Sequence, residues 1–218
     1  MIMAVKKKHR SKPLYRAVKR TFDVTASILL IIICSPIFLI LMLLVKITSE
    51  GWMFYSDFRL GRYGKEIKVW KFRSMYIDAE SNIDDYLTPE QKEIWLRERK
   101  LDHDPRITPI GRFMRKTSMD ELPQLFNILG GTMTFIGPRP ITRSELEQHF
   151  TPKERKKYLS VRPGLLGYWA VKSRSNADFD SGERQKLELE YIDKRSIWFD
   201  IKIILRAIPA VLSGKGAK

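Results

Sequence analysis

The chain has 218 residues, enough for one domain with a modest core and appended segments. Its 40 Lys and Arg residues against 25 Asp and Glu residues give a formal net charge of +15, which predicts an anionic partner: nucleic acid, anionic lipid or a phosphorylated small molecule. The only cysteine, Cys34, excludes an intrachain disulfide and fits a reducing compartment.

A basic N-terminal segment, residues 1–20, leads into an apolar membrane segment, residues 21–50. From Val24 to Val45 the chain carries no charge, and a straight helix of this length would reach about 33 Å, close to the thickness of a hydrocarbon core. The simple interpretation is a single transmembrane helix. A cleaved signal peptide is disfavoured, because no small-residue cleavage site follows the run.

Two features of this segment argue against a simple span. Ser35 and Pro36 lie in its middle, where proline removes a backbone donor and clashes with the preceding turn. Basic residues flank both ends, so the positive-inside rule places both ends on the cytoplasmic face. A re-entrant helix that breaks at Ser35–Pro36 satisfies both observations and is favoured. A kinked transmembrane helix stays open as the alternative.

Residues 52–76 predict a β-hairpin, with aromatic and β-branched runs around a glycine-containing turn, "RLGRYG". We interpret that motif as a turn rather than as a phosphate loop. Lys71 and Arg73, near the end of the hairpin, are candidate phosphate contacts, although a basic strand would also carry them for solubility. Residues 86–100 predict a solvated surface helix that begins at a Thr88 cap.

The stretch "TSMDELPQLFNIL", residues 117–129, holds an adjacent pair of acids, Asp120 and Glu121, in a basic region. They are the only acids between Asp104 and Glu145, an interval with six basic residues. One interpretation is a capping box, with the serine of "SMDE" as N-cap and the glutamate at the third position. The other starts the helix at the proline of "ELPQ", which leaves the pair on the approach turn. The residues alone do not separate the two.

The arginines in the motifs around the carboxylate pair suggest that the site acts on a phosphate group. Arg115, Arg139 and Arg162 offer planar donor forks suited to phosphate oxygens. We expect neighbouring cations to keep Asp120 ionised near pH 7, so that it can attack phosphorus and form an acyl phosphate. Glu121 is a candidate ligand for Mg²⁺, which takes one or two carboxylates together with substrate phosphates.

The C-terminal third predicts two more helices. Residues 183–195 form the first, and residues 196–212 combine apolar bulk with Trp198, which suits an interfacial amphipathic helix or a buried core helix. Residues 213–218 are expected to be disordered. The predicted fold is therefore α+β and mostly helical, with a membrane helix, a small β-hairpin and interfacial amphipathic helices.

Several long motifs, in order, resemble the monotopic bacterial phosphoglycosyl transferases, also called bacterial sugar transferases. The resemblance runs from residue 19 almost to the C-terminus and includes the Ser-Pro break of the re-entrant helix. Its motifs are "KRTFDV" at 19–24, "VWKFRSM" at 69–75, "DPRIT" at 104–108, "GRFMRKTSMDELPQLFNIL" at 111–129, "IGPRP" at 136–140, "VRPGLLGYW" at 161–169 and "YIDKRSIWFDIKI" at 191–203.

The resemblance implies transfer of a sugar-1-phosphate from a nucleotide sugar, usually a UDP-sugar, to a polyprenyl phosphate such as undecaprenyl phosphate. It assigns Asp120 as nucleophile, Glu121 as the Mg²⁺-associated partner, and Arg115 and Arg139 as family arginines. Residues 51–212 would then be a membrane-associated catalytic domain on the cytoplasmic face of the bacterial inner membrane. The short length resembles the single-domain members, and the C-terminal motifs resemble the branch that starts exopolysaccharide or capsule assembly.

Two non-catalytic alternatives are weaker. A membrane-anchored basic module would bind nucleic acid or anionic lipid, but it has no need of the carboxylate pair, so no nucleic-acid partner is expected. A scaffold without turnover would not need the intact pair and arginines. Membrane lipid is the remaining expected partner, and the sequence leaves open which sugar is transferred and whether the chain forms a homo-oligomer.

Overall fold

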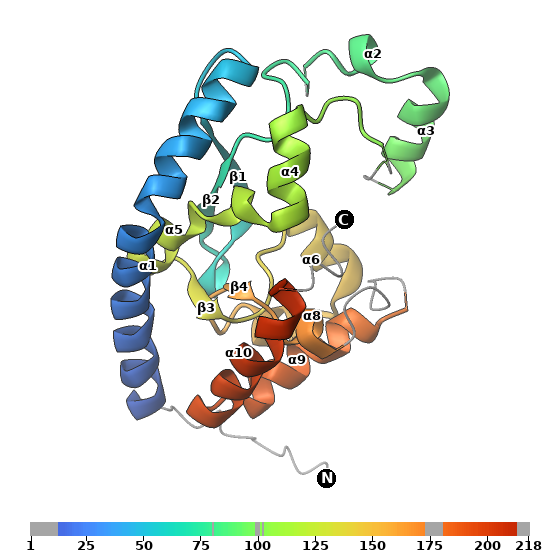
Figure 1. The fold of residues 1–218 in the computed structure, drawn as a ribbon. Helices are drawn as coiled ribbons and strands as arrows, with labels where there is room; N and C mark the ends of the chain where they lie inside the picture. Colours follow the sequence, from blue (N-terminus) through green and yellow to red (C-terminus); the bar gives the residue numbers. More distant parts are fainter. Residues whose placement is uncertain (1–12, 80, 99–100, 102, 173–180, 213–218) are drawn as a thin grey trace.

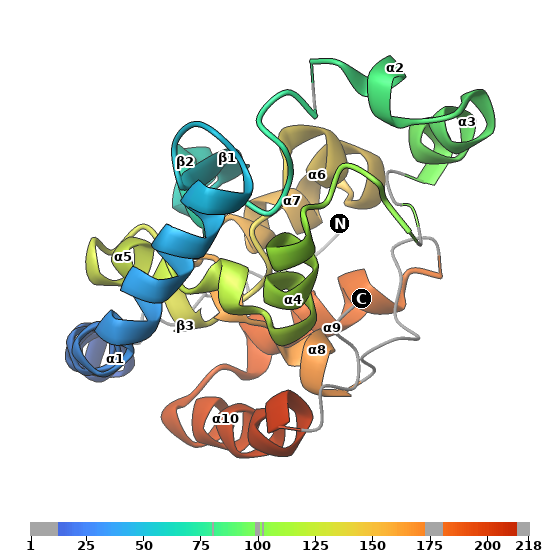
Figure 2. The same ribbon diagram turned by 45° about the horizontal axis from the view of Figure 1, so that its top comes forward.

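The structure is a computed structural model, and it describes residues 13–79, 81–98, 101, 103–172 and 181–212 (Figure 1). Helix α1, Pro13–Thr48, is its longest element, with 36 residues, and it bends part-way along its length (Figures 1 and 2). By length and composition it suffices to cross a membrane. The helix begins earlier than the predicted segment 21–50 and continues through Pro36, so this proline lies within one helix; the re-entrant path stays a prediction.

One stripe of α1 packs against the protein while most of its apolar side chains stay exposed. Phe38, Leu41 and Val45 are buried in a core that includes Phe72 and Ile128. The opposite side chains of the helix lie on the surface, as expected for a helix that contacts lipid rather than a second protein layer. This arrangement fits association with a membrane.

The predicted hairpin is confirmed. Strands β1, Phe54–Leu60, and β2, Glu66–Phe72, pair antiparallel, with Phe54 opposite Phe72. The "RLGRYG" motif forms the turn between them, where the 3₁₀ turn η1, Arg62–Gly64, contains Tyr63 with a left-handed φ of 64°.

Two further helices continue the chain, α2 (Ile83–Tyr86) and α3 (Pro89–Glu98). The predicted surface helix is confirmed in α3, where the Thr88 hydroxyl accepts a hydrogen bond from the Gln91 backbone at 3.3 Å. Both helices lie at the edge of the molecule, away from α1 (Figures 1 and 2).

A close backbone approach positions helix α4, Pro109–Thr117. The Thr108 side chain caps the helix by accepting from the Gly111 backbone at 3.0 Å, and the Thr108 N–H donates to the Ser74 carbonyl. A Cβ on Gly111 would lie 1.9 Å from the Ser74 carbonyl oxygen, so only glycine allows this packing. The start of α4 is thereby fixed against the end of the hairpin.

Helix α5, Gln124–Leu129, is held at both sides by polar contacts. The Asn127 side chain accepts from the Trp70 N–H at 3.0 Å and donates to the Lys68 carbonyl at 2.6 Å, which clamps α5 to β2. From α1, the Arg20 guanidinium donates to the Ile128 and Leu129 carbonyls at 2.7 Å each. These carbonyls belong to the helix C-terminus, where a cation is favoured.

The rest of the chain forms a second core around a short parallel sheet. Residues Ile141, Tyr158, Leu187, Tyr191 and Ile203 lie in this core. Its elements are β3 (Thr134–Ile136), α6 (Arg143–His149), α7 (Pro152–Tyr158), β4 (Gly164–Leu166), α8 (Tyr168–Lys172), α9 (Glu183–Lys194) and α10 (Ile197–Leu212).

Both predicted C-terminal helices are confirmed, and α10 has one buried and one exposed apolar face, while its interfacial placement stays a prediction. Ile203 is buried, whereas Trp198 is 80% exposed and Leu205 is also exposed. Asp200 accepts hydrogen bonds from Tyr15 at 2.8 Å and from Lys19 at 2.6 Å, so one face of α10 is tied to the start of α1. The mostly helical α+β fold with a small antiparallel sheet and a long apolar N-terminal helix is as predicted.

Substitution of Asn127 tests the clamp between α5 and β2. We expect Asn127→Ala to lower the free energy of unfolding by about 2 kcal/mol, because it leaves the Trp70 N–H and the Lys68 carbonyl without a partner. Chemical unfolding in detergent micelles measures the change. The control is Thr132→Ala, which removes a single exposed partner of Asn127 and is expected to cost less. Equal losses for the two variants would contradict the clamp.

Candidate active site

The carboxylate pair lies on the turn that joins α4 to α5. Helix α4 ends at Thr117, its C-cap residue Ser118 has a left-handed φ of 58°, and Met119–Glu121 form a single 3₁₀ turn, η2. Pro123 directly precedes α5, and no side chain caps the turn. The capping-box interpretation is therefore wrong, and the pair sits on the approach turn, as the alternative predicted.

The two carboxylates have different surroundings. Asp120 is only 8% exposed, which is unusual for an acid and costs free energy unless the site compensates. Glu121 is partly exposed and accepts from the Lys71 ammonium at 3.1 Å. Because Asp120 is buried while Glu121 is accessible and ion-paired, the two carboxylates are suited to different roles in a reaction.

Burial controls the ionisation of Asp120. Desolvation raises the pKa of Asp120 above its ordinary value, and the neighbouring charge of Glu121 raises it further. Lys71 and Arg115 lower it, but they do not cancel the effect of burial. Of the three arginines predicted beside Asp120, Arg115 acts on its pKa, together with Lys71, and the two cations do not dominate that pKa.

Arg115 is placed by the contact between α4 and the end of the hairpin. Its Nε donates to the Ser74 hydroxyl at 2.9 Å, and burial lowers the pKa of the guanidinium. Nearby, Arg106 forms a fork on Asp104, with Nε and Nη2 at 2.9 and 2.7 Å from the two carboxylate oxygens. The "DPRIT" motif is therefore an internal brace for the segment behind Arg115.

The other predicted phosphate contacts lie elsewhere. Arg73 is buried and donates to the Ser49 carbonyl at 2.6 Å, so it anchors the end of α1. Arg139 follows β3, and Arg162 precedes β4 and lines a cavity beside α1. Within the part of the chain that the structure describes, no hydrogen bond or ion pair joins these three guanidiniums to Asp120 or Glu121. The structure brings together Lys71, Arg115 and the pair.

The sequence interpretation missed Glu188, a fully buried acid under the Pro-Arg-Pro loop. It accepts from the Arg139 backbone N–H at 3.0 Å, while the Arg139 carbonyl accepts from the Tyr158 hydroxyl at 2.7 Å. Burial raises the pKa of Glu188 from its ordinary 4.5 to about 7. Its position on the same face of α9 as Leu187 and Tyr191 was the signal for a buried acid.

The donor set at the pair fits Mg²⁺ completed by a substrate. No cluster of three or more His, Cys, Asp or Glu side chains with metal-binding geometry occurs among the described residues. Glu121 supplies one accessible carboxylate beside Asp120, and Mg²⁺ uses one or two carboxylates when substrate phosphates and water fill its remaining positions.

Comparison with known proteins identifies the family. The family model for bacterial sugar transferases matches residues 14–214. The chain is 41% identical over 205 residues to the undecaprenyl-phosphate galactose phosphotransferase of Salmonella typhimurium, which covers 93% of this chain and 42% of that protein. It is 36% identical over 208 residues to the exopolysaccharide production protein ExoY of Rhizobium meliloti, with 94% and 90% covered.

A third relative is the UDP-glucose:undecaprenyl-phosphate glucose-1-phosphate transferase of Escherichia coli, 36% identical over 200 residues, with 88% of this chain and 40% of that protein covered. The chain thus spans about two fifths of the Salmonella and Escherichia proteins and most of the Rhizobium one. Because the family model matches almost the whole sequence, the chain belongs to the bacterial sugar transferase family, as its motifs predicted.

The buried Glu188 predicts a pH-dependent stability. The unfolded state releases this proton near pH 4.5, while the folded state keeps it to about pH 7. Between these values the unfolded state binds fewer protons, so stability falls as pH rises, by about 1.4 kcal/mol per unit of pKa difference. The Gln side chain keeps an acceptor for Arg139 but cannot ionise. We therefore expect Glu188→Gln to lose less stability than wild type between about pH 5 and about pH 8.

Thermal unfolding in detergent at the two pH values measures this difference. The control is Glu147→Gln, at an exposed glutamate on α6, which should keep the wild-type pH dependence. If the stability of Glu188→Gln and that of wild type changed equally between the two pH values, the raised pKa of Glu188 would be contradicted.

Proposed function

We propose that the protein transfers a sugar-1-phosphate from a UDP-sugar to a polyprenyl phosphate, with Asp120 as nucleophile. The observation that carries the proposal is the buried Asp120 on a turn that also presents Glu121, next to Lys71 and Arg115. The names of the relatives support it, since they act on undecaprenyl phosphate with galactose or glucose donors.

The first step forms a covalent intermediate. A carboxylate oxygen of Asp120 attacks the β-phosphorus, the bond from that phosphorus to the bridging oxygen breaks, and UMP leaves with the electron pair. The product is an acyl phosphate that carries the sugar. Lys71 and Arg115 lie where they can balance the negative charge that builds on the phosphoryl oxygens.

The second step releases the sugar phosphate onto the lipid. An oxygen of the polyprenyl phosphate attacks the same phosphorus, and Asp120 departs as a carboxylate. A covalent intermediate suits these substrates, because a water-soluble donor and a lipid acceptor need not be bound at the same time. We place the reaction at the cytoplasmic face of the bacterial inner membrane, where the basic ends of α1 favour the headgroup region.

We propose Mg²⁺ as the cofactor, held by Glu121 with the diphosphate of the donor. When bound, it neutralises charge on the diphosphate and stabilises the departing UMP. Glu121 suits this role because it is accessible, and its pairing with Lys71 keeps its carboxylate oriented beside Asp120.

Replacing the nucleophile tests the reaction. We expect Asp120→Asn to lower UMP release from a UDP-sugar by about a thousandfold or more, because an amide cannot form the acyl phosphate. The assay uses detergent-solubilised protein, a panel of UDP-sugars, polyprenyl phosphate and Mg²⁺. Without acceptor, intact-protein mass spectrometry should show one added phosphosugar on wild type and none on the variant. The control, Asp193→Asn, removes an exposed carboxylate and should release UMP at the wild-type rate.

The variant Glu121→Gln tests the metal site. Removing one charge from the ligand should raise the Mg²⁺ concentration needed for half-maximal UMP release and lower the maximal rate. The exposed Glu147→Gln serves as the matched control. A Glu121→Gln enzyme with the wild-type Mg²⁺ titration would sink this assignment.

A further inference from the structure

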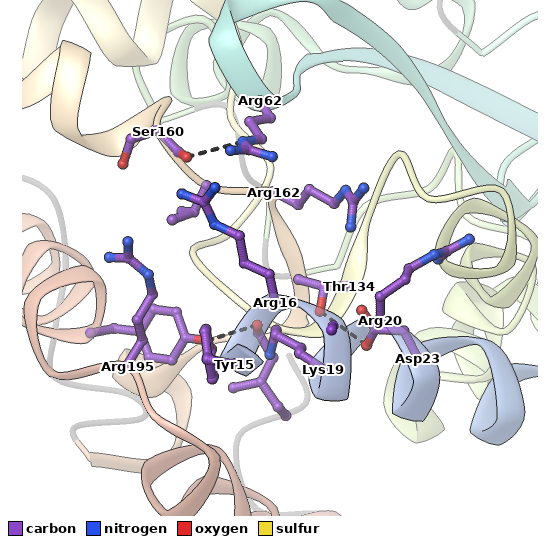
Figure 3. A pocket seen from close by; sticks show the side chains of 14 residues that line it. Tyr15, Arg16, Lys19, Arg20, Asp23, Arg62, Thr134, Ser160, Arg162 and Arg195 are labelled. Carbon is purple, nitrogen blue, oxygen red and sulfur yellow. Dashed lines mark hydrogen bonds between the residues drawn. The ribbon is translucent and has the colours of Figure 1, made fainter. Parts of the chain in front are cut away.

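A cavity of about 270 Å³ lies beside the first turns of α1 (Figure 3), and neither Asp120 nor Glu121 lines it. Its walls come from α1, the turn between β1 and β2, strand β3, the loop before β4 and the end of α9. Asp23 is the one carboxylate among its lining residues. The lining is strongly basic, with six cations: Arg16, Lys19, Arg20, Arg62, Arg162 and Arg195.

Several of these cations are already engaged by the protein. Lys19 pairs with Asp200, Arg20 holds the end of α5, and the Nε of Arg62 donates to the Ser160 carbonyl at 3.2 Å. Arg16 and Arg162 differ: within the described part of the chain, neither guanidinium forms a hydrogen bond or an ion pair. Figure 3 shows the Arg16 side chain extending from α1 into the cavity, toward the segments that carry Arg62 and Arg162.

The charges in the cavity are not balanced. Burial lowers the pKa of Arg162, and the like charges of Arg20 and Arg62 lower it further, opposed by Asp23 alone. One Asp23 oxygen is engaged, because it accepts from the Thr134 hydroxyl at 3.0 Å and from the Phe135 N–H at 3.1 Å, whereas its other oxygen is buried without a hydrogen-bond partner among the described residues. Half-buried guanidiniums that face other cations are stabilised by an added anion.

We propose that this cavity binds a phosphate group, as a second anion site separate from Asp120 and Glu121. Planar guanidiniums with unused donors match phosphate oxygens, and Arg16 and Arg162 reach the cavity from different elements. The "RLGRYG" motif contributes Arg62 to this site, so that turn has a role in anion binding after all. Arg162, predicted to bind a substrate phosphate, contributes to this second site under the proposal.

The position of the cavity favours a phosphate carried by a lipid headgroup. Its α1 residues directly precede the uncharged run, and the exposed apolar face of α10 is tied to the same turns through Asp200. A headgroup at the membrane surface would therefore reach the cavity while its acyl chains follow α1 and α10. A water-soluble phosphate ester is the other source of the same chemistry.

Binding measurements on the detergent-solubilised full chain test the site. Isothermal titration uses dioctanoyl phosphatidate as the lipid phosphate, inorganic phosphate as the soluble one, and dioctanoylglycerol as the phosphate-free control. We expect saturable binding of a phosphate ligand to wild type. In the double variant Arg16→Ala/Arg162→Ala the dissociation constant should be about tenfold higher. Arg143→Ala, at an exposed arginine on α6, should bind as wild type does.

The outcomes separate the sources and test the proposal. Tighter binding of phosphatidate identifies a lipid headgroup, and tighter binding of inorganic phosphate identifies a soluble ester. Absence of binding for both ligands, or equal binding to wild type and the double variant, overturns the site. If the double variant does not fold, the single change Arg16→Ala, at an exposed residue, replaces it. The binding measurement does not require sugar transfer. A failure of the proposed phosphate site can therefore be distinguished from a failure of the proposed reaction.

Discussion

The position of the carboxylate pair depends on the contact between Arg20 and the last carbonyls of α5. Helix α5 has six residues, so its two ends are only about 9 Å apart. A cation from the membrane helix holds one end, and the turn with Asp120 and Glu121 leads into the other. The Asn127 clamp fixes the same helix to β2, which carries Lys71. The pair, its nearest cation and the membrane helix are therefore set against one another by a few polar contacts on one short element.

This placement has an electrostatic consequence for Asp120. A buried carboxylate with a raised pKa is a stronger base, and a more basic carboxylate is the better nucleophile once it is ionised. Lys71 and Arg115 oppose the desolvation of Asp120 in part, and the net shift of its pKa remains upward. The arrival of a diphosphate would change this balance, because its charge competes for the same cations.

Local patterns in the sequence predicted the elements well. Alternating apolar residues, turn glycines and caps placed the hairpin, α3, α9 and α10, because these signals act over a few residues. Pro123 likewise indicated where the helix after the pair begins. The proline in α1 was a weaker guide, since the helix continues through it. Whether a helix continues through a proline or breaks there depends on packing against neighbouring elements rather than on local propensity.

Long-range placement of side chains was not predictable in the same way. Arg73, Arg139 and Arg162 look alike in the sequence as arginines of the family motifs. In the structure Arg73 donates to the Ser49 carbonyl, Arg139 is exposed and contacts Glu188 through its backbone N–H, and Arg162 lines the cavity beside α1. Each destination depends on elements far away in the chain. The burial of Glu188 had a local signal in the apolar face of α9, but its partner Arg139 lies 49 residues away and was not predictable from that signal.

The cavity and the carboxylate pair are linked through one residue. Arg20 lines the cavity and also holds the C-terminal carbonyls of α5. A phosphate in the cavity adds negative charge beside this guanidinium and competes with those carbonyls for its donors, while Arg16 and Arg162 offer unused donors that limit the competition. Wherever the anion settles, its effect on Arg20 reaches α5 directly, because no flexible segment separates the two. A phosphate bound in the cavity and the proposed nucleophile Asp120 would therefore both depend on the contact between Arg20 and α5.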